Sequence, residues 1–339
     1  MNMTSLRVLI VAALLVGLGA TGGLAGQPNS SSEILPGKFL FYGGDPIEGN
    51  IQNGFSGSLM VGGGVFTGDL SQDIADDDQK TISNLNQKGE NDTEFIPLII
   101  GDINYTFVDA RIRLGMDFTN GPGAYVHHYI PGVGILALRM GISSDEVWAD
   151  PYLTNTARSK TDMDTVRATL GWKHVFESPF SLRYGLESRD IDNDLVGTQE
   201  NSLKREGEIH NFQADYLILN TGAHRLTTGL VYELADLDGK AEAYKGYGAE
   251  IAHVFQANRW DLKTAVSGMK KDFDGRHIKF NKTREDKIYT VDTAFTFYRP
   301  FGFDNYFISV FGAYTLTDSN IDFYESKGLT TGIGVGFTF

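Results

Sequence analysis

The chain has 339 residues, a formal net charge of −14 at pH 7, and no cysteine. Strong acidity argues against a nucleic-acid partner, because phosphate binding requires Lys and Arg. The lack of cysteine excludes a disulfide framework, a Cys-ligated metal site and a lipoprotein anchor.

The N-terminus has the pattern of a targeting signal. Arg7 supplies positive charge, residues 8–20 are apolar or small, and Ala25 or Gly26 can end a small-residue cleavage site. Residues 1–25 therefore predict a cleaved signal peptide, too short for a membrane-spanning helix. Residues 26–53 form a polar lead-in segment rich in Gly and Pro, which lies either in the periplasm or inside a lumen.

From residue 54 onward, apolar and polar residues alternate with the period of two that is typical of β-strands. The clearest strand is 111–118, in which Ile112, Leu114 and Met116 alternate with Arg113, Gly115 and Asp117. The predicted strands are 54–67, 95–107, 111–118, 134–142, 165–176, 180–186, 210–218, 226–232, 247–255, 260–268, 289–297, 306–314 and 328–339.

Two kinds of connection alternate between these strands. Short turns occur near Asp109, Ser178, Thr221 and Ala257, and aromatic residues lie beside them. Long polar loops are expected at 68–94, 187–208 and 270–286. Short periplasmic turns, long outer loops and interfacial aromatics indicate an outer-membrane barrel. The alternative interpretation, a soluble all-β protein, would have to explain why nearly every strand has one polar face.

We therefore expect an all-β fold over residues 54–339, a transmembrane antiparallel up-and-down β-barrel. An upward strand ends at Phe118 and a downward strand begins near Thr165, so zero or two strands lie between them. The apolar alternation in 134–142 favours two, which predicts fourteen strands, with twelve as the alternative.

The final segment, GLTTGIGVGFTF, has one apolar face and one nearly bare face, and ends on Phe337-Thr338-Phe339. It resembles the closing strand of Gram-negative outer-membrane barrels. Together with the signal peptide and the GFSG sequence at 54–57, it resembles an uncharacterised family of gammaproteobacterial outer-membrane proteins of unknown function. The resemblance implies a barrel in the outer membrane and assigns no activity.

The resemblance also implies partners. These are outer-membrane lipid and lipopolysaccharide, together with the barrel-assembly machinery and periplasmic chaperones during biogenesis. Phe337 and Phe339 would form the assembly signal that this machinery reads. We expect a monomer.

Charged residues of both signs occupy the parity predicted to face the lumen. The predicted lumen-lining charges are Asp102, Arg111, Arg113, Asp117, Arg183, Glu187, Asp215, Arg225, Glu233, Lys263 and Asp292. Because Arg113 precedes Asp117 and Arg183 precedes Glu187, we expect basic and acidic belts stacked along the barrel axis. Two interpretations stay open: a solute path with a transverse field, or cross-strand ion pairs that fill a narrow lumen.

The first long loop carries an acidic cluster, which we interpret as an acidic mouth. Its central residues are Asp73, Asp76, Asp77 and Asp78. Hard cations require several oxygen ligands, but none of the acidic loops matches a calcium-binding loop. We therefore expect a solvated acidic surface that mildly favours cations, with no metal and no cofactor.

Catalytic signals are weak. His127 and His128 form a pair in an expected Gly/Pro-flanked loop, followed by Ser143, Ser144 and Asp145, but their spacing does not establish a triad. We expect a channel for small polar solutes rather than an enzyme. The alternatives are a closed surface protein acting through its acidic loops, and a barrel hydrolase or lipid-modifying enzyme.

Overall fold

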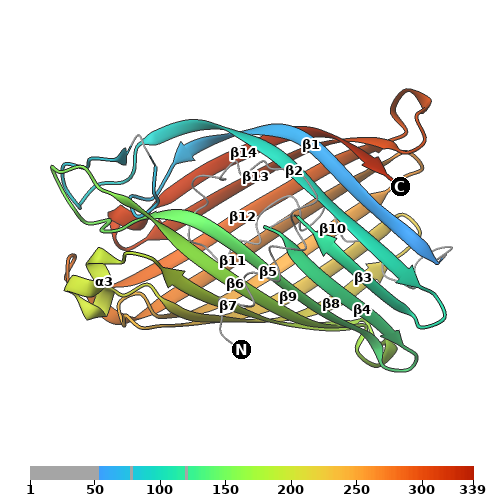
Figure 1. Ribbon diagram of the computed structural model, residues 1–339, viewed down its shortest axis with the longest axis horizontal. Coiled ribbons are helices and arrows are strands. Elements are labelled where there is room, and N and C mark those ends of the chain that lie inside the picture. The colour runs from blue at the N-terminus through green and yellow to red at the C-terminus, as the bar shows by residue number, and fades with distance from the viewer. Residues whose placement is uncertain (1–52, 77–78, 119–120) are drawn as a thin grey trace.

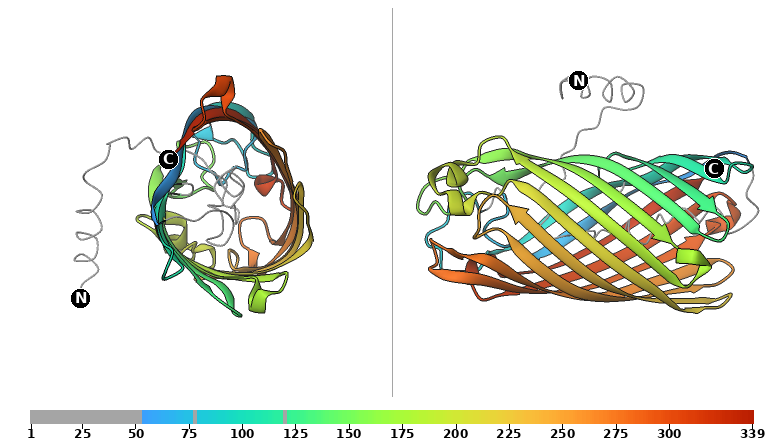
Figure 2. Two further views of the ribbon diagram at one scale, coloured as in Figure 1. Left: turned by 90° about the vertical axis from the view of Figure 1, so that its right-hand side faces the viewer. Right: turned by 90° about the horizontal axis from the view of Figure 1, so that it is seen from below.

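The computed structural model describes residues 53–76, 79–118 and 121–339. Fourteen antiparallel strands close into one barrel, in which each strand pairs with its sequence neighbours and β1 pairs with β14 (Figure 1). Figure 2 shows the closed ring viewed from the end that carries the C-terminus. The prediction of fourteen strands is confirmed. The predicted signal peptide at 1–25 and nearly all of the lead-in at 26–53 lie outside the described residues.

The strands are long, and most extend beyond what a bilayer requires. They are β1 (Gly54–Asp69), β2 (Asn91–Phe107), β3 (Ile112–Asp117), β4 (Gly123–Ile130), β5 (Gly134–Trp148), β6 (Lys160–Lys173), β7 (Phe180–Ile191), β8 (Gly207–Asn220), β9 (His224–Leu237), β10 (Tyr244–Gln256), β11 (Trp260–His277), β12 (Lys282–Tyr298), β13 (Tyr306–Ser319) and β14 (Ser326–Thr338).

Short helical segments lie in the connections. They are η2 (Val175–Glu177), α3 (Leu195–Gln199), η3 (Asn201–Leu203), η4 (Pro300–Gly302) and η5 (Asp322–Tyr324). Among the described residues, none of the helices has the length and apolar character needed to cross a membrane.

The two ends of the sheet close through β1 and β14. Met60 pairs with Gly336 and Val61 with Val335. The Phe339 N–H donates to the Gly57 carbonyl at 3.1 Å, and the Gly57 N–H donates to the Phe339 carbonyl at 3.0 Å. Closure gives partners to backbone groups that would otherwise meet hydrocarbon.

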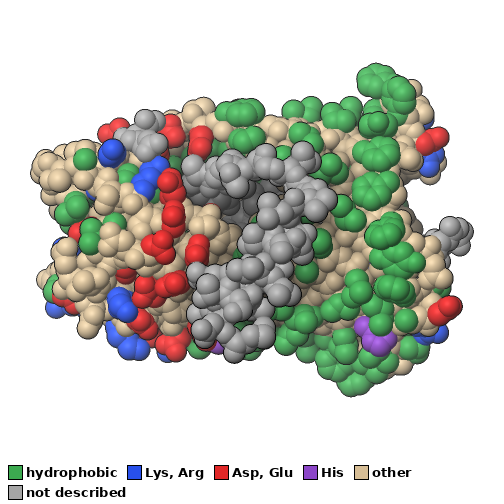
Figure 3. Space-filling view, viewed as in Figure 1, with side chains coloured by type: hydrophobic (Ala, Val, Ile, Leu, Met, Phe, Trp, Pro, Cys, Tyr) green, Lys and Arg blue, Asp and Glu red, His purple; other side chains and the backbone are tan. Residues whose placement is uncertain are grey.

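The residues at outward-facing strand positions are mostly apolar and exposed, as predicted. Leu230 is 69% exposed on β9, whereas its neighbour Gly229 is buried on the inward face. At the short-turn end, Phe301 is 91% exposed, and Tyr306 packs against Phe337. Figure 3 shows apolar side chains gathered toward this end, and acidic and basic ones toward the long-loop end. The apolar belt and its aromatic rim place this barrel in the bacterial outer membrane.

One predicted loop is wrong. Residues 270–286 are not a long loop, because Lys270 pairs with Lys287 as β11 and β12 continue outward to a tight turn after His277. Outward residues such as Lys270 and Asp272 are polar there because the strands have left the apolar belt. The predicted loop 187–208 likewise begins later, since β7 extends to Ile191.

The region between Phe118 and Gly134 also differs from the expectation. His127 and His128 lie in β4 and not in a loop. Because adjacent strand residues face opposite sides, the two imidazoles cannot converge on one site. Arg111 lies in the turn before β3 rather than in the strand, with a left-handed φ of 54°, and is exposed.

The barrel interior has two chemically distinct parts. The first, which we call the apolar sector, is a buried cluster on β1, β2, β12 and β13 formed by Met60, Leu98, Ile100, Ala294, Phe307 and Phe311. The second, the charged sector, consists of the ion pairs Asp117–Arg139, Arg167–Glu187–Arg189 and Glu233–Lys271.

The bare glycine face of β14 belongs to the apolar sector. A Cβ atom at Gly332 would lie 2.2 Å from the Phe311 ring, and one at Gly336 would lie 2.0 Å from the Phe307 ring. The glycines therefore make room for aromatic rings that lie flat on the inner wall.

Candidate functional site

The predicted lumen-lining charges, apart from Arg111, lie on inward strand positions and are buried or half-buried. These are Asp102, Arg113, Asp117, Arg183, Glu187, Asp215, Arg225, Glu233, Lys263 and Asp292. Some of their ion-pair partners lie on other strands, and others lie two residues away on the same strand, as Arg189 does for Glu187. Asp117 pairs with Arg139 of β5 at 2.6 Å, and Glu187 pairs with Arg167 of β6 at 2.8 Å.

Sequence reasoning missed the basic partners. Arg139 and Arg167 lie within predicted strands at inward positions, so the same alternation could have identified them. Arg189 and Lys271 lie in outer strand ends that were predicted as loops, where the apolar alternation has stopped. Lys271 lies 3.0 Å from the Glu233 carboxylate, and both side chains are almost fully buried. The Tyr244 hydroxyl completes this group by donating to Glu233 at 2.7 Å and accepting from Lys271 at 2.9 Å.

The acidic mouth is only partly what the sequence suggested. The described start of the first loop folds inward, with Gln72, Ile74 and Ala75 buried. Asp73 accepts a hydrogen bond from Ser71 and lines an internal cavity. Asp76 acts electrostatically on Glu94 of β2. Asp77 and Asp78 lie outside the described residues. A fully solvated acidic loop is therefore the wrong description, because its apolar residues draw it inward.

The outer connections share one hydrophobic core, which we call the loop cap. Its members come from several loops far apart in sequence and are Ile82, Tyr152, Val196, Leu203, Ala241, Ile321, Phe323 and Tyr324. Phe280 packs against them from the β11–β12 turn. Loops that bury a common core behave as one folded unit across the end of the barrel.

Arg158 joins two of these loops. Its guanidinium donates to the carbonyls of Gln72 at 2.6 Å and Pro151 at 2.9 Å, and also to that of Gln79. The same group lies 4.3 Å from the centre of the Trp148 ring. Burial lowers the pKa of Arg158 to about 10, so the guanidinium stays charged at neutral pH.

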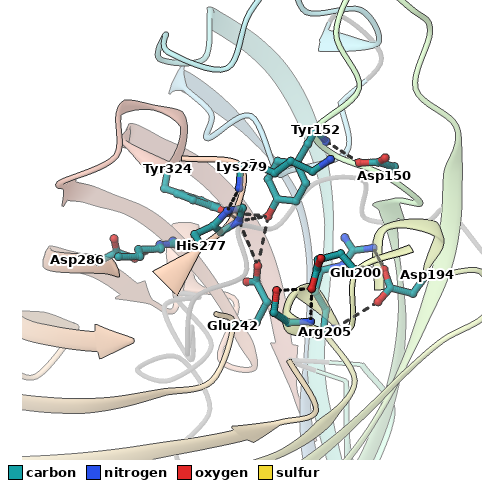
Figure 4. A network of polar contacts seen from close by, with 12 residues as sticks. Asp150, Tyr152, Asp194, Glu200, Arg205, Glu242, His277, Lys279, Asp286 and Tyr324 are labelled. Carbon is teal, nitrogen blue, oxygen red and sulfur yellow. Dashed lines mark hydrogen bonds and ion pairs between the residues drawn. The ribbon is translucent and has the colours of Figure 1, made fainter. Parts of the chain in front are cut away.

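A buried polar network lies within the cap (Figure 4). The hydroxyls of Tyr152 and Tyr324 are 2.6 Å apart, and His277 Nε2 lies 3.0 Å and 2.9 Å from them. Tyr152 also donates to Glu242 at 3.3 Å. His277 is fully buried at the outer end of β11, beyond the outward Lys270 that marks the end of the apolar belt.

Burial shifts the protonation of this network. It raises the pKa of Glu242 to about 7, although Arg284 and Arg205 oppose the change. It lowers the pKa of His277 to about 3, and nearby Arg284 acts in the same direction. Burial also raises the pKa values of Tyr152 and Tyr324 well above 10. At neutral pH His277 and the two tyrosines are therefore uncharged, whereas Glu242 is close to its midpoint between the protonated and ionised forms.

A cavity of about 80 Å³ lies beneath the cap and against the charged sector. Four basic and three acidic side chains line it, namely Arg189, Arg205, Lys271, Arg284, Asp73, Glu242 and Asp286. This volume suits a few water molecules.

The other predicted sites have simpler surroundings. Ser143 donates to Asp145 at 3.5 Å within β5, and His127 lies 5.0 Å from the Tyr125 ring on β4. In the part of the chain that the structure describes, no group of three His, Asp or Glu residues could hold a metal ion. The ring centres of Phe337 and Phe339 are 6.2 Å apart in a stacked arrangement, beside the paired strands β1 and β14 that close the barrel. Their role as an assembly signal stays a prediction.

Solved structures similar to this chain are outer-membrane proteins. OmpT, an outer membrane protein of Vibrio cholerae, is 9% identical, with 84% of this chain and 97% of that chain covered and a TM-score of 0.40. The outer membrane channel DcaP of Acinetobacter baumannii is 8% identical, with coverages of 84% and 97% and a TM-score of 0.38. LpxR from Salmonella typhimurium is 10% identical, with coverages of 64% and 88% and a TM-score of 0.38.

These likenesses concern the barrel architecture and assign no activity. No curated protein matches the sequence. A family model described as "Protein of unknown function (DUF2860)" matches residues 54–338, which is the whole barrel except its last residue. The chain therefore belongs to the DUF2860 family.

Proposed function

We propose that this protein is a gated channel for small charged or dipolar solutes, in which the loop cap is the gate. The observation that carries the proposal is the charged sector, which lines the wall beneath the cap. A barrel of about eight strands has an interior that its own side chains can fill. A barrel of fourteen strands is wider, so its interior has space that the side chains of the wall do not fill. Ion pairs of both signs on that wall suit a path for polar solutes.

The cap supports gating rather than a constantly open pore. Its core joins several connections that are far apart in sequence and that lie together at the outer end of the barrel. Passage would therefore require the cap to loosen. The competing proposal is a closed surface protein that acts through its outer loops. A cap that never opens would favour this second function.

Planar-bilayer recording of the refolded barrel tests the proposal. The wild type should show small, infrequent current steps. Phe323→Ala removes a fully buried cap residue, which typically costs about 3–5 kcal/mol in a folded core, and should raise the open fraction severalfold.

Phe301→Ala is the matched control. The same change occurs there at a side chain that is 91% exposed in a short turn, and conductance should match the wild type. A correctly folded Phe323→Ala barrel that carries no current would overturn the channel and leave the closed surface barrel.

A further inference from the structure

The barrel wall is not uniformly sealed. β3 has 6 residues and β4 has 8, between β2 with 17 and β5 with 15. β3 pairs with β2 only from Asp102 to Phe107, and β4 pairs with β5 only from Gly134 to Gly141. Figure 1 shows this short hairpin ending partway along the wall.

The outer halves of β2 and β5 therefore border a break in the backbone ladder, which we call the lateral seam. Its inner end is marked by hydrogen bonds from Phe118 N–H to the Gly101 carbonyl and from Ile142 N–H to the Pro122 carbonyl. At its outer end, Ile74 of the first loop forms one bridge with Val147 of β5. Trp148 Nε1 donates to the Ile74 carbonyl at 2.7 Å. Among the described residues, no strand spans the seam between these ends.

The inner part of the seam faces the membrane, and its outer part reaches the interface. On β2, Phe95 and Ile99 point outward and are 67% and 58% exposed. On β5, the outward face changes from Ile142 to Ser144 and Glu146, as expected near the outer interface. Pro97 lies in the seam-facing half of β2, and proline within sheets is confined to edge strands.

Unpaired strand edges are not tolerated against lipid unless they line a protein or aqueous path. Among the described residues, the seam is thus a part of the wall where no hydrogen-bonded ladder joins the two bordering strands.

The apolar sector begins at the edge of this seam. Leu98 and Ile100 point inward from β2 and are 8% and 4% exposed, and Met60 packs behind them. At the outer end of the seam, Ile74 and Val147 also line the charged cavity. An entering molecule would pack among the buried apolar side chains on one side and lie near the charged cavity toward the cap.

We propose that the lateral seam admits acyl-chain amphiphiles from the outer leaflet, with the chain on the apolar sector and the polar head toward the charged cavity. This inference goes beyond the proposed axial channel, because it assigns a different ligand class and a route through the wall. It does not require the cap to open.

The test uses dansyl-undecanoic acid, a fluorescent fatty acid, with the full barrel in lipid nanodiscs. The wild type should show saturable binding above that of empty nanodiscs. Because the chain has no native cysteine, Ile74→Cys with Val147→Cys can form only the intended disulfide. Bridge partners have the Cα separation that a disulfide needs. Oxidation should weaken probe binding about tenfold or more, the loss expected when apolar burial is blocked, and reduction should restore it.

Glu208→Cys with Asp236→Cys is the matched control, because these residues pair across the continuous β8–β9 ladder. Oxidation of this pair should leave binding unchanged. A second comparison uses neighbours on opposite faces of β2. Leu98→Gln should weaken binding, whereas Ile99→Gln on the outward face should not.

Each outcome decides between the two proposals. Absence of saturable binding to the wild type, or binding insensitive to both the disulfide and Leu98→Gln, overturns the lateral route. Current steps without probe binding would overturn the lateral route and keep the axial channel. Probe binding without current steps would keep the lateral route and overturn the axial channel.

Discussion

The apolar and charged sectors share one barrel, the same inward parity and the same strand geometry, yet their chemistry is opposite. In the apolar sector, glycines of β14 leave space that Phe307 and Phe311 fill, so the inner wall there is a packed apolar cluster. In the charged sector, Glu233 and Lys271 face each other across strands in a buried pair. The difference shows that strand parity decides which side chains face inward, while cross-strand neighbours decide what the interior can bind.

The largest expected effect comes from breaking one pair of the charged sector. Lys271→Met should leave the Glu233 carboxylate buried without its cation and lower the free energy of unfolding by about 3–5 kcal/mol. Lys271→Met combined with Glu233→Gln should recover much of this loss. Urea titrations of the barrel in lipid vesicles measure both. An equal loss in the single and double variants would mean that the pair does not define the charged sector.

The second prediction sharpens the distinction between the inner and outer faces. Leu230→Arg places a charge against lipid and should cost about 2–4 kcal/mol near the bilayer midplane. Gly229→Arg on the inward face should cost less, although a Cβ there would lie 2.3 Å from Asp215 and the carboxylate must shift. The same urea titrations compare them, and a larger loss for Gly229→Arg would show that the charged sector is too crowded to accept another side chain.

The third prediction concerns the cap above the charged sector. The raised pKa of Glu242 gives stability that is present below pH 4.5 and is lost as pH rises through about 7. The lowered pKa of His277 gives stability that is present above pH 6.5 and is lost as pH falls toward about 3. Between pH 4.5 and 6.5 the two cancel, because unfolding releases a proton from Glu242 and adds one to His277.

Single variants should expose the two opposing slopes. Glu242→Gln should make the cap lose stability as pH falls below 6.5, and His277→Gln should make it lose stability as pH rises above 4.5. The slope should approach about 1.4 kcal/mol per pH unit, reduced by the neighbouring Arg205, Arg284 and Asp73. Amide hydrogen exchange of the cap residues measures it. A wild-type cap with a steep slope between pH 4.5 and 6.5 would contradict the compensation.

The smallest effect should come from the glycine face of the apolar sector. Gly332→Ala forces the Phe311 ring to move and should cost about 1–3 kcal/mol through overpacking. Gly312→Ala on β13 is the control, since its Cβ would meet no atom closer than 3.7 Å and should change stability little. Thermal unfolding followed by electrophoretic mobility compares the two. Equal midpoints would show that the aromatic wall is loosely packed.

Much of the barrel could be predicted from local pattern. Leu114 and Arg113 fall on opposite faces because side chains alternate along any strand, and a short turn near Thr221 needs only a few local residues. The break at β3–β4 could not be predicted, since the residues around His127 and His128 carry no clear alternation. The outer ends of β11 and β12 were also missed, because strands that leave the membrane lose the apolar face that identifies them.

The sequence by itself determined a closed antiparallel barrel of fourteen or twelve strands, its outer-membrane location and the inward positions of its charges. These follow from the period of two along each strand and from the need to pair every backbone group in lipid. Only the tertiary structure decided that Asp117 pairs with Arg139, that distant loops bury Phe323 and Tyr324 in one cap, and that the wall has a lateral seam. Those features depend on which strands lie side by side and how far each ladder runs, and side-chain alternation along one strand carries no information about its neighbour's length.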